Sequence, residues 1–464
     1  MSTLQIIEIL VRIAWLAGAV AFVLGLVRMN SPATARNGNL LSAGGMAVAV
    51  AATAILILAR ELLDPLSFGI RASAWVLIVI GVAAGGGLGL YAARTVKMTA
   101  MPQLVSLFNA VGGGAAALIA IDDYLRLLGG GAVRIDTHVF IVLDIVIGSI
   151  TFTGSLVASG KLQGLIPGKP ILIPGGRLVT LALAAIVVVA AAILFVTGTP
   201  SLALMLLILA AALIFGVTMT LPIGGADMPV VISLLNSFTG TAVAMAGFVI
   251  DNPVLIIAGA LVGASGAILT KLMADAMNRS VLNIMIGGFG GGEGTTAVAG
   301  GAGGSVREIS ADDAAIQLAY AQHVIVVPGY GLAVAQAQHA VRELAELLED
   351  RGVDVKYAIH PVAGRMPGHM NVLLAEANVP YPQLKEMDDI NPEFERADVA
   401  LVIGANDVTN PAARRPGSPV SGMPILDVDH AKSIVVAEGL GSLAPLKLHD
   451  INTAPLSASV VPTA

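Results

Sequence analysis

Long apolar runs dominate the first 280 residues of the chain. About nine segments contain some twenty mostly apolar residues each, the length that an α-helix needs to cross a bilayer. They start near Ile6, Leu40, Ala74, Met101, His138, Leu178, Ser201, Met228 and Pro253. The pattern predicts an α-helical polytopic membrane domain over residues 1–280 that begins and ends on opposite sides of the membrane.

A different pattern follows. An apolar run at 323–328 ends in Pro-Gly-Tyr-Gly, an amphipathic run continues to Asp350, and a second apolar run covers 353–359. This order predicts a βαβ unit. Gly329, Gly331 and Val334 occupy its fingerprint positions for a tight turn, a close phosphate approach and helix packing. The sequence therefore predicts an α/β Rossmann-like domain with a parallel sheet over residues 311–464.

The segment between these parts is rich in glycine. Ten of the eighteen residues from 287 to 304 are glycine, a composition typical of flexible coil with a reach of roughly 25 Å. Residues 281–310 are therefore predicted to be a linker.

Charge follows the same division. Hydrophobic residues make up 56% of the chain and charged residues 12%. Residues 1–280 carry 14 Lys and Arg against 10 Asp and Glu, and the remainder carries 11 against 21. The acidic balance excludes a basic face for nucleic acid. The absence of cysteine excludes thiolate and iron–sulfur chemistry, and the histidine spacing indicates no metal site.

Basic residues alternate between the predicted loops. One side holds Arg28, Arg36, Arg94, Lys97, Lys161, Lys169 and Arg177. The loops of the opposite side mix arginine with acidic residues. The positive-inside rule then predicts that the C-terminal domain lies in the cytoplasm. The bacterial cytoplasmic (inner) membrane is the location that we expect for the helices.

Some polar residues fall inside predicted spans. Asp144 lies within the fifth span, and helical spacing puts Gly148, Thr151 and Ser155 on its face. Asn109 in the fourth span and Asn236 in the eighth are similar. Burying such groups in hydrocarbon costs several kcal/mol, so they are expected to face partners, water or a conduction path. Simple hydrogen bonding between helices is the alternative.

The third predicted strand, 397–403, ends in Gly404-Ala-Asn-Asp-Val408, at the edge where open α/β sheets bind ligands. The second strand ends in His360 instead of the acidic residue that would hold a free ribose 2′-hydroxyl. This favours NADP over NAD. His360 and His369 could equally brace the loop between them.

Several motifs resemble one known family. They are residues 328–338, 360–376 and 404–407, and in the membrane part Met101-Pro102, 151–155, Gly224–Pro229 and 276–280. Together they are similar to the β subunit of proton-translocating NAD(P) transhydrogenase over about residues 1–436.

The resemblance implies an enzyme of the Re/Si-specific type. Hydride passes from NAD(H) on a partner α subunit to NADP(H) on this chain while protons cross the membrane, and the complex is a dimer of αβ pairs. The implied NADP(H) contacts are Tyr330, Val362, Ala363, Gly364, Arg365, Met366, Pro367, Gly404, Ala405, Asn406, Asp407, Val408, Gly422 and Met423. Asp407 matches a carboxylate that couples protonation to NADP binding, and Asp227 belongs to the proton path.

The chain departs from the family pattern at two places. Asn109 stands where many members carry a mid-membrane histidine, and an amide cannot titrate near neutral pH. We therefore expect Asp144 to carry the proton. From about residue 437 the expected Lys-Arg pair and lid are replaced by Ala437-Glu438-Gly439 and a tail rich in Ala, Pro and Ser. Glu438 would repel a 2′-phosphate.

Two other functions stay open at this stage. One is an ion channel or transporter gated by a nucleotide-binding domain, although the sequence contains no filter-like segment. The other is a catalytically impaired transhydrogenase subunit, because the motif that grips the 2′-phosphate is missing.

Overall fold

The computed structural model divides the chain into two compact units. The membrane unit comprises residues 1–225 and 231–269, and the sheet unit comprises residues 226–230 and 270–464. The described residues are 3–29, 31–63, 72–97, 100–128, 135–168, 170–224, 227–277, 280–281, 284, 307–364, 368–414, 422–437 and 458–461. The glycine-rich segment, Arg365, Met366, Pro367 and Glu438 lie outside them.

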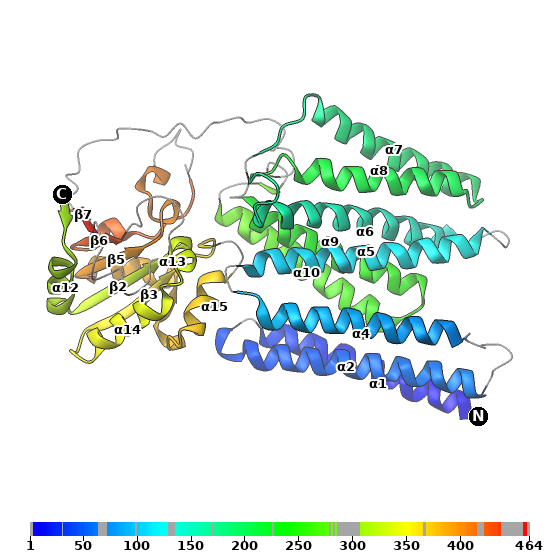
Figure 1. Cartoon of the computed structure of the whole chain (residues 1–464), viewed down its shortest axis with the longest axis horizontal. Helices are drawn as coiled ribbons and strands as arrows, with labels where there is room; N and C mark the ends of the chain where they lie inside the picture. The colour runs from blue at the N-terminus through cyan, green and yellow to red at the C-terminus, as the bar shows by residue number, and fades with distance from the viewer. Residues whose placement is uncertain are drawn as a thin grey trace. The chain divides into compact units, whose positions relative to one another are not determined.

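Nine helices among the described residues are long and apolar enough to cross a bilayer. They are α1 (Thr3–Arg28), α2 (Pro32–Leu63), α4 (Ala72–Thr95), α5 (Met101–Leu127), α6 (Ile135–Leu162), α7 (Gly176–Thr197), α8 (Leu202–Thr220), α9 (Met228–Val249) and α10 (Pro253–Ala276) (Figure 1). Each corresponds to one predicted span. The prediction of a polytopic membrane protein is confirmed.

Local sequence sets several helix ends. The side-chain oxygen of Asn252 accepts the N–H groups of Val254 and Leu255, at 3.0 and 3.4 Å, and so caps the start of α10. Pro102 lies in the first turn of α5, where a backbone N–H is not required. Gly198 adopts φ 61° after α7 and donates its N–H to the carbonyl of Leu194.

Small residues let neighbouring helices approach closely. A Cβ added at Gly240 of α9 would lie 2.4 Å from the nitrogen of Gly263 and 2.8 Å from the oxygen of Gly259 in α10. Between α5 and α6, a Cβ at Gly148 would lie 2.6 Å from the oxygen of Gly113. The Gly259/Gly263 pair is thus a packing motif, as the sequence indicated.

The sheet unit contains one seven-stranded sheet in the order β1-β7-β6-β5-β2-β3-β4. The strands are β1 (Arg307–Ile309), β2 (His323–Pro328), β3 (Asp354–Ile359), β4 (Leu384–Glu386), β5 (Val399–Ile403), β6 (Ile434–Ala437) and β7 (Ala458–Val461). The five strands from β6 to β4 run parallel, and β7 pairs antiparallel with β6 and β1. The Rossmann-like parallel sheet is confirmed.

Short helices connect the strands. They are α12 (Ala311–Tyr320), α13 (Tyr330–Ala335), α14 (Gln338–Glu349), α15 (His369–Glu376) and α16 (Met387–Ile390), with 3₁₀ turns at Tyr381–Gln383, Asn391–Arg396, Asp407–Thr409, Pro411–Arg414 and Val428–His430. Ser310 and Asp313 form a reciprocal capping box at the start of α12.

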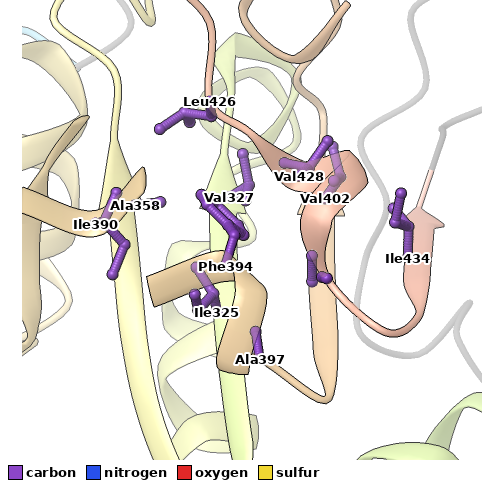
Figure 2. Packing of buried hydrophobic residues seen from close by; sticks show 12 residues of the cluster. Ile325, Val327, Ala358, Ile390, Phe394, Ala397, Val402, Leu426, Val428 and Ile434 are labelled. Carbon is purple, nitrogen blue, oxygen red and sulfur yellow. The ribbon is translucent and has the colours of Figure 1, made fainter. Parts of the chain in front are cut away.

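An apolar cluster covers one face of the parallel strands. Phe394 lies at its centre, between Ile325 and Val327 of β2 and Ile390 of α16, and Leu426 closes it from a later segment (Figure 2). Each of these five side chains is almost completely excluded from solvent. Burying a large apolar side chain contributes about 1.5–3 kcal/mol, so the cluster holds the strand ends in register.

Two features of the sheet unit differ from the sequence expectation. The amphipathic run after β2 is divided into α13 and α14, because Gln336 adopts the left-handed conformation, with φ 52°. The end of the Ala-, Pro- and Ser-rich tail contributes β7, inserted between β6 and β1. Neither feature has a strong signal in the residue pattern.

Candidate functional site

The three central strands end at one edge of the sheet. Pro328 of β2 pairs with Ile403 of β5, and β3 runs parallel to β2 on the other side. The turns that begin at Gly329, His360 and Gly404 therefore lie along the same carboxyl edge. This is the arrangement predicted for the ligand-binding edge of an open α/β sheet.

Two of these turns cross in close contact. The N–H of Gly329 donates to the carbonyl of Ile403, and the N–H of Gly331 donates to that of Gly404, both at 2.9 Å. A Cβ at Gly331 would lie 2.7 Å from the Cα of Gly404, and one at Gly329 would lie 2.1 Å from its oxygen. Backbone of the β5 turn therefore fills the space beside both glycines.

The crossing changes the interpretation of the fingerprint. The sequence assigned Gly331 to a close phosphate approach, whereas its open side faces the backbone of Gly404. Val334 was expected to pack its helix on the sheet, but its side chain is 52% exposed. The packing role of Val334 is therefore wrong, and Leu332 and Ala333 are the residues of α13 that are buried.

His360 joins two segments of the edge. Its Nε2 donates to the carbonyl of Pro424 at 2.9 Å, and its Nδ1 accepts the N–H of Val362 at 3.2 Å. Burial lowers the pKa of His360, and the bond to Pro424 offsets this only in part. A neutral imidazole that bonds at both nitrogens braces the loop, which is the alternative role considered for this residue.

The loop after His360 packs on the start of α15. Gly364 adopts φ 107°, and a Cβ there would lie 2.5 Å from Nδ1 of His369. The ring of His369 is buried, and its centroid lies 6.0 Å from that of Tyr330. Tyr330, Gly364 and His369 thus come together from three turns, while Val362 is half-buried and Ala363 buried.

The turn after β5 presents polar groups at the edge. Gly404 adopts φ 64°, and the next residue, Ala405, packs on the apolar cluster. Asn406 and Asp407 are exposed, and Val408 is buried, with its carbonyl accepting the N–H of Leu426 at 2.9 Å.

A nearby segment carries the last two predicted contacts. Gly422 adopts φ 79° and donates its N–H to the carbonyl of Ala413 at 2.7 Å, and Met423 is half-buried. Arg414 forms ion pairs with Asp427 and Asp429. Arg414, the arginine of this described segment, is therefore already paired with two carboxylates.

The membrane unit buries the predicted carboxylate. Asp144 of α6 is 0% exposed, and neither of its oxygens has a hydrogen-bond partner among the described residues. Gly148, Thr151 and Ser155 are buried on the same helix, and Thr151 donates to the carbonyl of Ile147. The polar stripe predicted along α6 therefore lies inside the helix bundle.

The predicted amides differ in their surroundings. Asn109 is buried in α5. Its side-chain amide donates to the backbone carbonyl of Ile232 in α9 at 3.4 Å, and its backbone carbonyl accepts a hydrogen bond from the hydroxyl of Thr239. Asn236 is half-buried in α9. Asp227 is half-buried just before α9. Asn109 therefore forms hydrogen bonds between two helices, one of the two roles that the sequence analysis left open for it.

Two buried ionisable groups lie near the two ends of α6. Lys161 was counted among loop charges, but it lies in α6, is 4% exposed, and donates to the carbonyls of Leu221 and Ile223. His138 lies at the start of α6, which is the edge of a span as expected, and its ring is buried with neither nitrogen bonded to a described residue. Helix α6 extends to Leu162, and the continuous helical run in the sequence up to that residue could have placed Lys161 inside the helix.

Hydrogen bonds also join α5 and α6 through residues that were not singled out. Ser106 donates to the carbonyl of Ser155 at 2.8 Å, and Ser159 donates to that of Gln103 at 3.2 Å. The polar contact between these helices therefore extends toward Lys161.

Comparison with known proteins gives this arrangement a family. The family described as NAD(P) transhydrogenase beta subunit matches residues 11–441. The chain belongs to the NAD(P) transhydrogenase beta subunit family. Two proteins named NAD(P) transhydrogenase subunit beta, from Rhodospirillum rubrum and from one of its strains, are each 50% identical to it over 430 residues, which is 91% of this chain and 89% of each relative.

Membership of the transhydrogenase beta subunit family confirms the resemblance stated from the motifs. It implies NAD(P) transhydrogenase activity, binding of a nicotinamide nucleotide and an alpha subunit as partner. The matched region contains the described helices of the membrane unit almost completely and the parallel strands of the sheet unit.

Proposed function

We propose that this chain binds NADP(H) at the carboxyl edge and exchanges hydride with NAD(H) on the α subunit, in a Re/Si-specific reaction coupled to proton translocation. The observation that carries the proposal is the interlocked crossing of the turns at Gly331 and Gly404. It fixes the backbone on either side of the edge, so the polar groups beside it have defined positions.

The described residues of the edge fit a dinucleotide in kind. They offer the phenol of Tyr330 and the exposed side chains of Asn406 and Asp407 above fixed backbone. The nicotinamide ring supplies the hydride chemistry when it is bound, so no side chain has to act covalently. We assign the remaining contacts to 362–367 and to Gly422 with Met423.

Each residue then has a positioning role. Gly329, Gly331 and Gly404 hold the two turns against each other, and His360 ties the third turn to Pro424. The buried Val408 anchors the turn that presents Asp407. We propose that Asp407, the carboxylate of this turn, couples proton translocation to nucleotide binding, as the family resemblance implies.

The membrane unit supplies the proton path in this proposal. Asp144 carries the proton, because it is a fully buried carboxylate with no described partner. Asn109 and Asn236 of the membrane unit line the same path, and Lys161 stabilises the connection between α8 and α9. Asp227, which the family resemblance assigns to proton coupling, belongs to the other unit. Coupling requires that protonation change the relative affinity for NADP+ and NADPH.

The proposed organisation follows from these roles. Residues 1–280 form the proton-translocating domain, 281–310 the linker, and 311–464 the NADP(H) domain with an atypical tail from about 437. The nucleotide domain faces the cytoplasm of a bacterial cell, and two αβ pairs, embedded in membrane lipid, form the complex.

The test uses the full chain co-expressed with its α subunit and reconstituted in proteoliposomes. We expect hydride transfer from NADH to an NADP analogue, with a change in internal pH. Asp144→Asn should abolish the pH change, whereas Asp122→Asn, which removes an exposed partner of Arg126, should preserve it. Unchanged pumping by Asp144→Asn would rule out the assigned proton carrier.

A second measurement tests the nucleotide assignment. Isothermal titration of the full chain should give micromolar or tighter NADP affinity, and Asn406→Ala should weaken it, because an amide that bonds the ligand contributes about 1 kcal/mol. Millimolar binding of NADP together with absent hydride transfer would instead identify a catalytically impaired subunit.

A further inference from the structure

A cavity of about 530 Å³ opens at one end of the membrane unit, between α1, α2 and the turn that joins α9 to α10. Glu8, Arg12, Arg60 and Asp251 contribute its charged groups. None of these residues belongs to the proposed proton path or to the nucleotide edge. The cavity is a separate feature that the transhydrogenase reaction does not explain.

The lining changes from charged to apolar along the helices. Arg60 lies in the last turn of α2, and Leu56, one turn deeper, lines the same cavity. Asp251 precedes α10, which begins at Pro253, and Ile257 lies roughly 6 Å further along the helix axis than Pro253 at 1.5 Å per residue. A charged rim above an apolar floor matches the change from headgroup to acyl chain in a bilayer leaflet.

An indole lies on the wall of the cavity. Nε1 of Trp15 donates to Oγ1 of Thr53 at 3.1 Å, which fixes the ring between α1 and α2. Tryptophan is enriched where protein meets the polar boundary of a membrane, because its ring is apolar and its N–H needs a partner. This wall is therefore suited to the glycerol and upper methylene region of a lipid.

Two of the four charged groups at the rim form an ion pair with each other, and the other two form none with a described residue. Arg60 bonds the carboxylate of Glu8 through Nη2 at 2.9 Å and Nε at 3.3 Å. Arg12 and Asp251 are exposed and form no ion pair with a described residue. Arg12 also lies one turn deeper in α1 than Glu8. An arginine at that depth is costly unless an anion accompanies it.

We propose that this cavity binds one phospholipid with a phosphoethanolamine headgroup. The phosphate lies on the Arg12 guanidinium, the ammonium on the Asp251 carboxylate, and the first methylenes on Leu56 and Ile257. A zwitterionic headgroup fits because Arg12 and Asp251 are one cation and one anion. An anionic headgroup would leave Asp251 opposed by like charge, and a choline group cannot donate a hydrogen bond to it.

The test is lipid retention by the full chain. The protein, alone and with its α subunit, is reconstituted in nanodiscs with equal amounts of phosphatidylethanolamine, phosphatidylglycerol and phosphatidylcholine, extracted into detergent and weighed by native mass spectrometry. We expect one phosphatidylethanolamine retained per chain. Arg12→Gln and Asp251→Asn should each lower retention about tenfold, the effect of losing one charge-assisted hydrogen bond.

Matched controls separate binding from folding. Arg28→Gln changes an exposed arginine at the opposite end of α1 and should leave retention unchanged. The double exchange Arg12→Asp with Asp251→Arg keeps one cation and one anion at the rim, and it should restore retention in part. The unfolding temperature of each purified variant is measured as well, and lipid retention is compared only among variants whose unfolding temperature equals that of the unaltered chain.

Several results would overturn the proposal. Equal retention of the three lipids, or retention unaffected by Arg12→Gln, would remove the specific site. Preference for phosphatidylglycerol, or displacement by inorganic phosphate, would identify a simple anion site. Loss of the lipid whenever the α subunit is present would show that a helix of that partner occupies the cavity.

Discussion

The sheet edge and helix α6 differ in whether their buried polar groups are hydrogen-bonded. At the edge, both ring nitrogens of His360 bond to the backbone, and the turns at Gly331 and Gly404 bond each other. In α6, both oxygens of Asp144 and both nitrogens of His138 are buried without a described partner. A satisfied edge is rigid before its ligand arrives, whereas an unsatisfied carboxylate lowers stability and is expected to have another role.

The largest expected effect tests the rigid edge. Gly331→Ala should lower the free energy of unfolding by about 3 kcal/mol, because its Cβ would lie 2.7 Å from the Cα of Gly404 and both turns would have to move. Nucleotide affinity should fall with it. Hydrogen exchange of β2 and β5 in the full chain, together with titration of NADP, measures both effects.

Gly352→Ala is the matched control for that substitution. Gly352 adopts φ 85°, and nothing lies within 4 Å of the added Cβ. The backbone preference alone should cost about 1 kcal/mol and leave nucleotide affinity unchanged. Equal losses for the two variants would mean that the crossing of the turns contributes nothing specific.

The next effect has the opposite sign and tests the unsatisfied carboxylate. Asp144→Leu should stabilise the membrane unit by about 2.5 kcal/mol, the cost of an aspartate at mid-helix in a bilayer. Proton pumping should be lost at the same time. Thermal unfolding in detergent measures the first quantity. A less stable Asp144→Leu variant would indicate that the carboxylate has an undescribed partner.

Lys161 is a buried polar group of the membrane unit that, like His360 at the sheet edge, is hydrogen-bonded to backbone. Its ammonium group donates to the carbonyls of Leu221 and Ile223, and the Leu221 carbonyl also accepts the N–H of Ile171, so Lys161→Met should leave the buried carbonyl of Ile223 without this donor. The expected loss is about 2 kcal/mol. The exposed Lys271, which pairs with Asp275, provides the control: Lys271→Met should change stability very little.

The smallest effect concerns an ion pair at the opposite end of the strands. Asp398 accepts a hydrogen bond from Lys432 and the N–H groups of Gln322 and His323, and these bonds lower its pKa to about 2. The stability it contributes, about 1 kcal/mol given its exposed partner, is present above pH 4 and is lost as pH falls toward 2.

Asp398→Asn tests this pH dependence. It should remove about 1 kcal/mol at pH 7 and flatten the acid limb of the stability profile. Urea unfolding of the full chain at several pH values, followed by hydrogen exchange of β2, gives both quantities. An unchanged acid limb would mean that Lys432 and the two backbone groups do not act through the charge of Asp398.

The sequence predicted the membrane helices well because length and apolarity decide them. Each predicted span became a helix, and the polar stripe beside Asp144 is buried as expected. It failed for Lys161, because burial at the end of a helix depends on the neighbouring segments and not on the residue's own position. Asn109 could be placed within its span, but its acceptor on α9 could not be predicted.

In the sheet unit the three strands β2, β3 and β5 and their carboxyl edge were predictable from apolar runs, whereas β1, β4, β6 and β7 were not singled out. The role of Gly331 was not, because the contact that fills its open side comes from Gly404, more than seventy residues later. The break at Gln336 was missed because an amphipathic pattern continues across it. The assignment of individual nucleotide contacts stays a prediction.

The crossing of the turns at Gly331 and Gly404 has a consequence for redesign of coenzyme preference. A loop grafted at either position must fit the backbone of the other turn. The carbonyls of Ile403 and Gly404 accept the N–H groups of Gly329 and Gly331, and neither Gly331 nor Gly404 has room for a Cβ. Variation in one turn is therefore tolerated only with a compensating change in the second, so the two segments should be exchanged between homologues as one cassette.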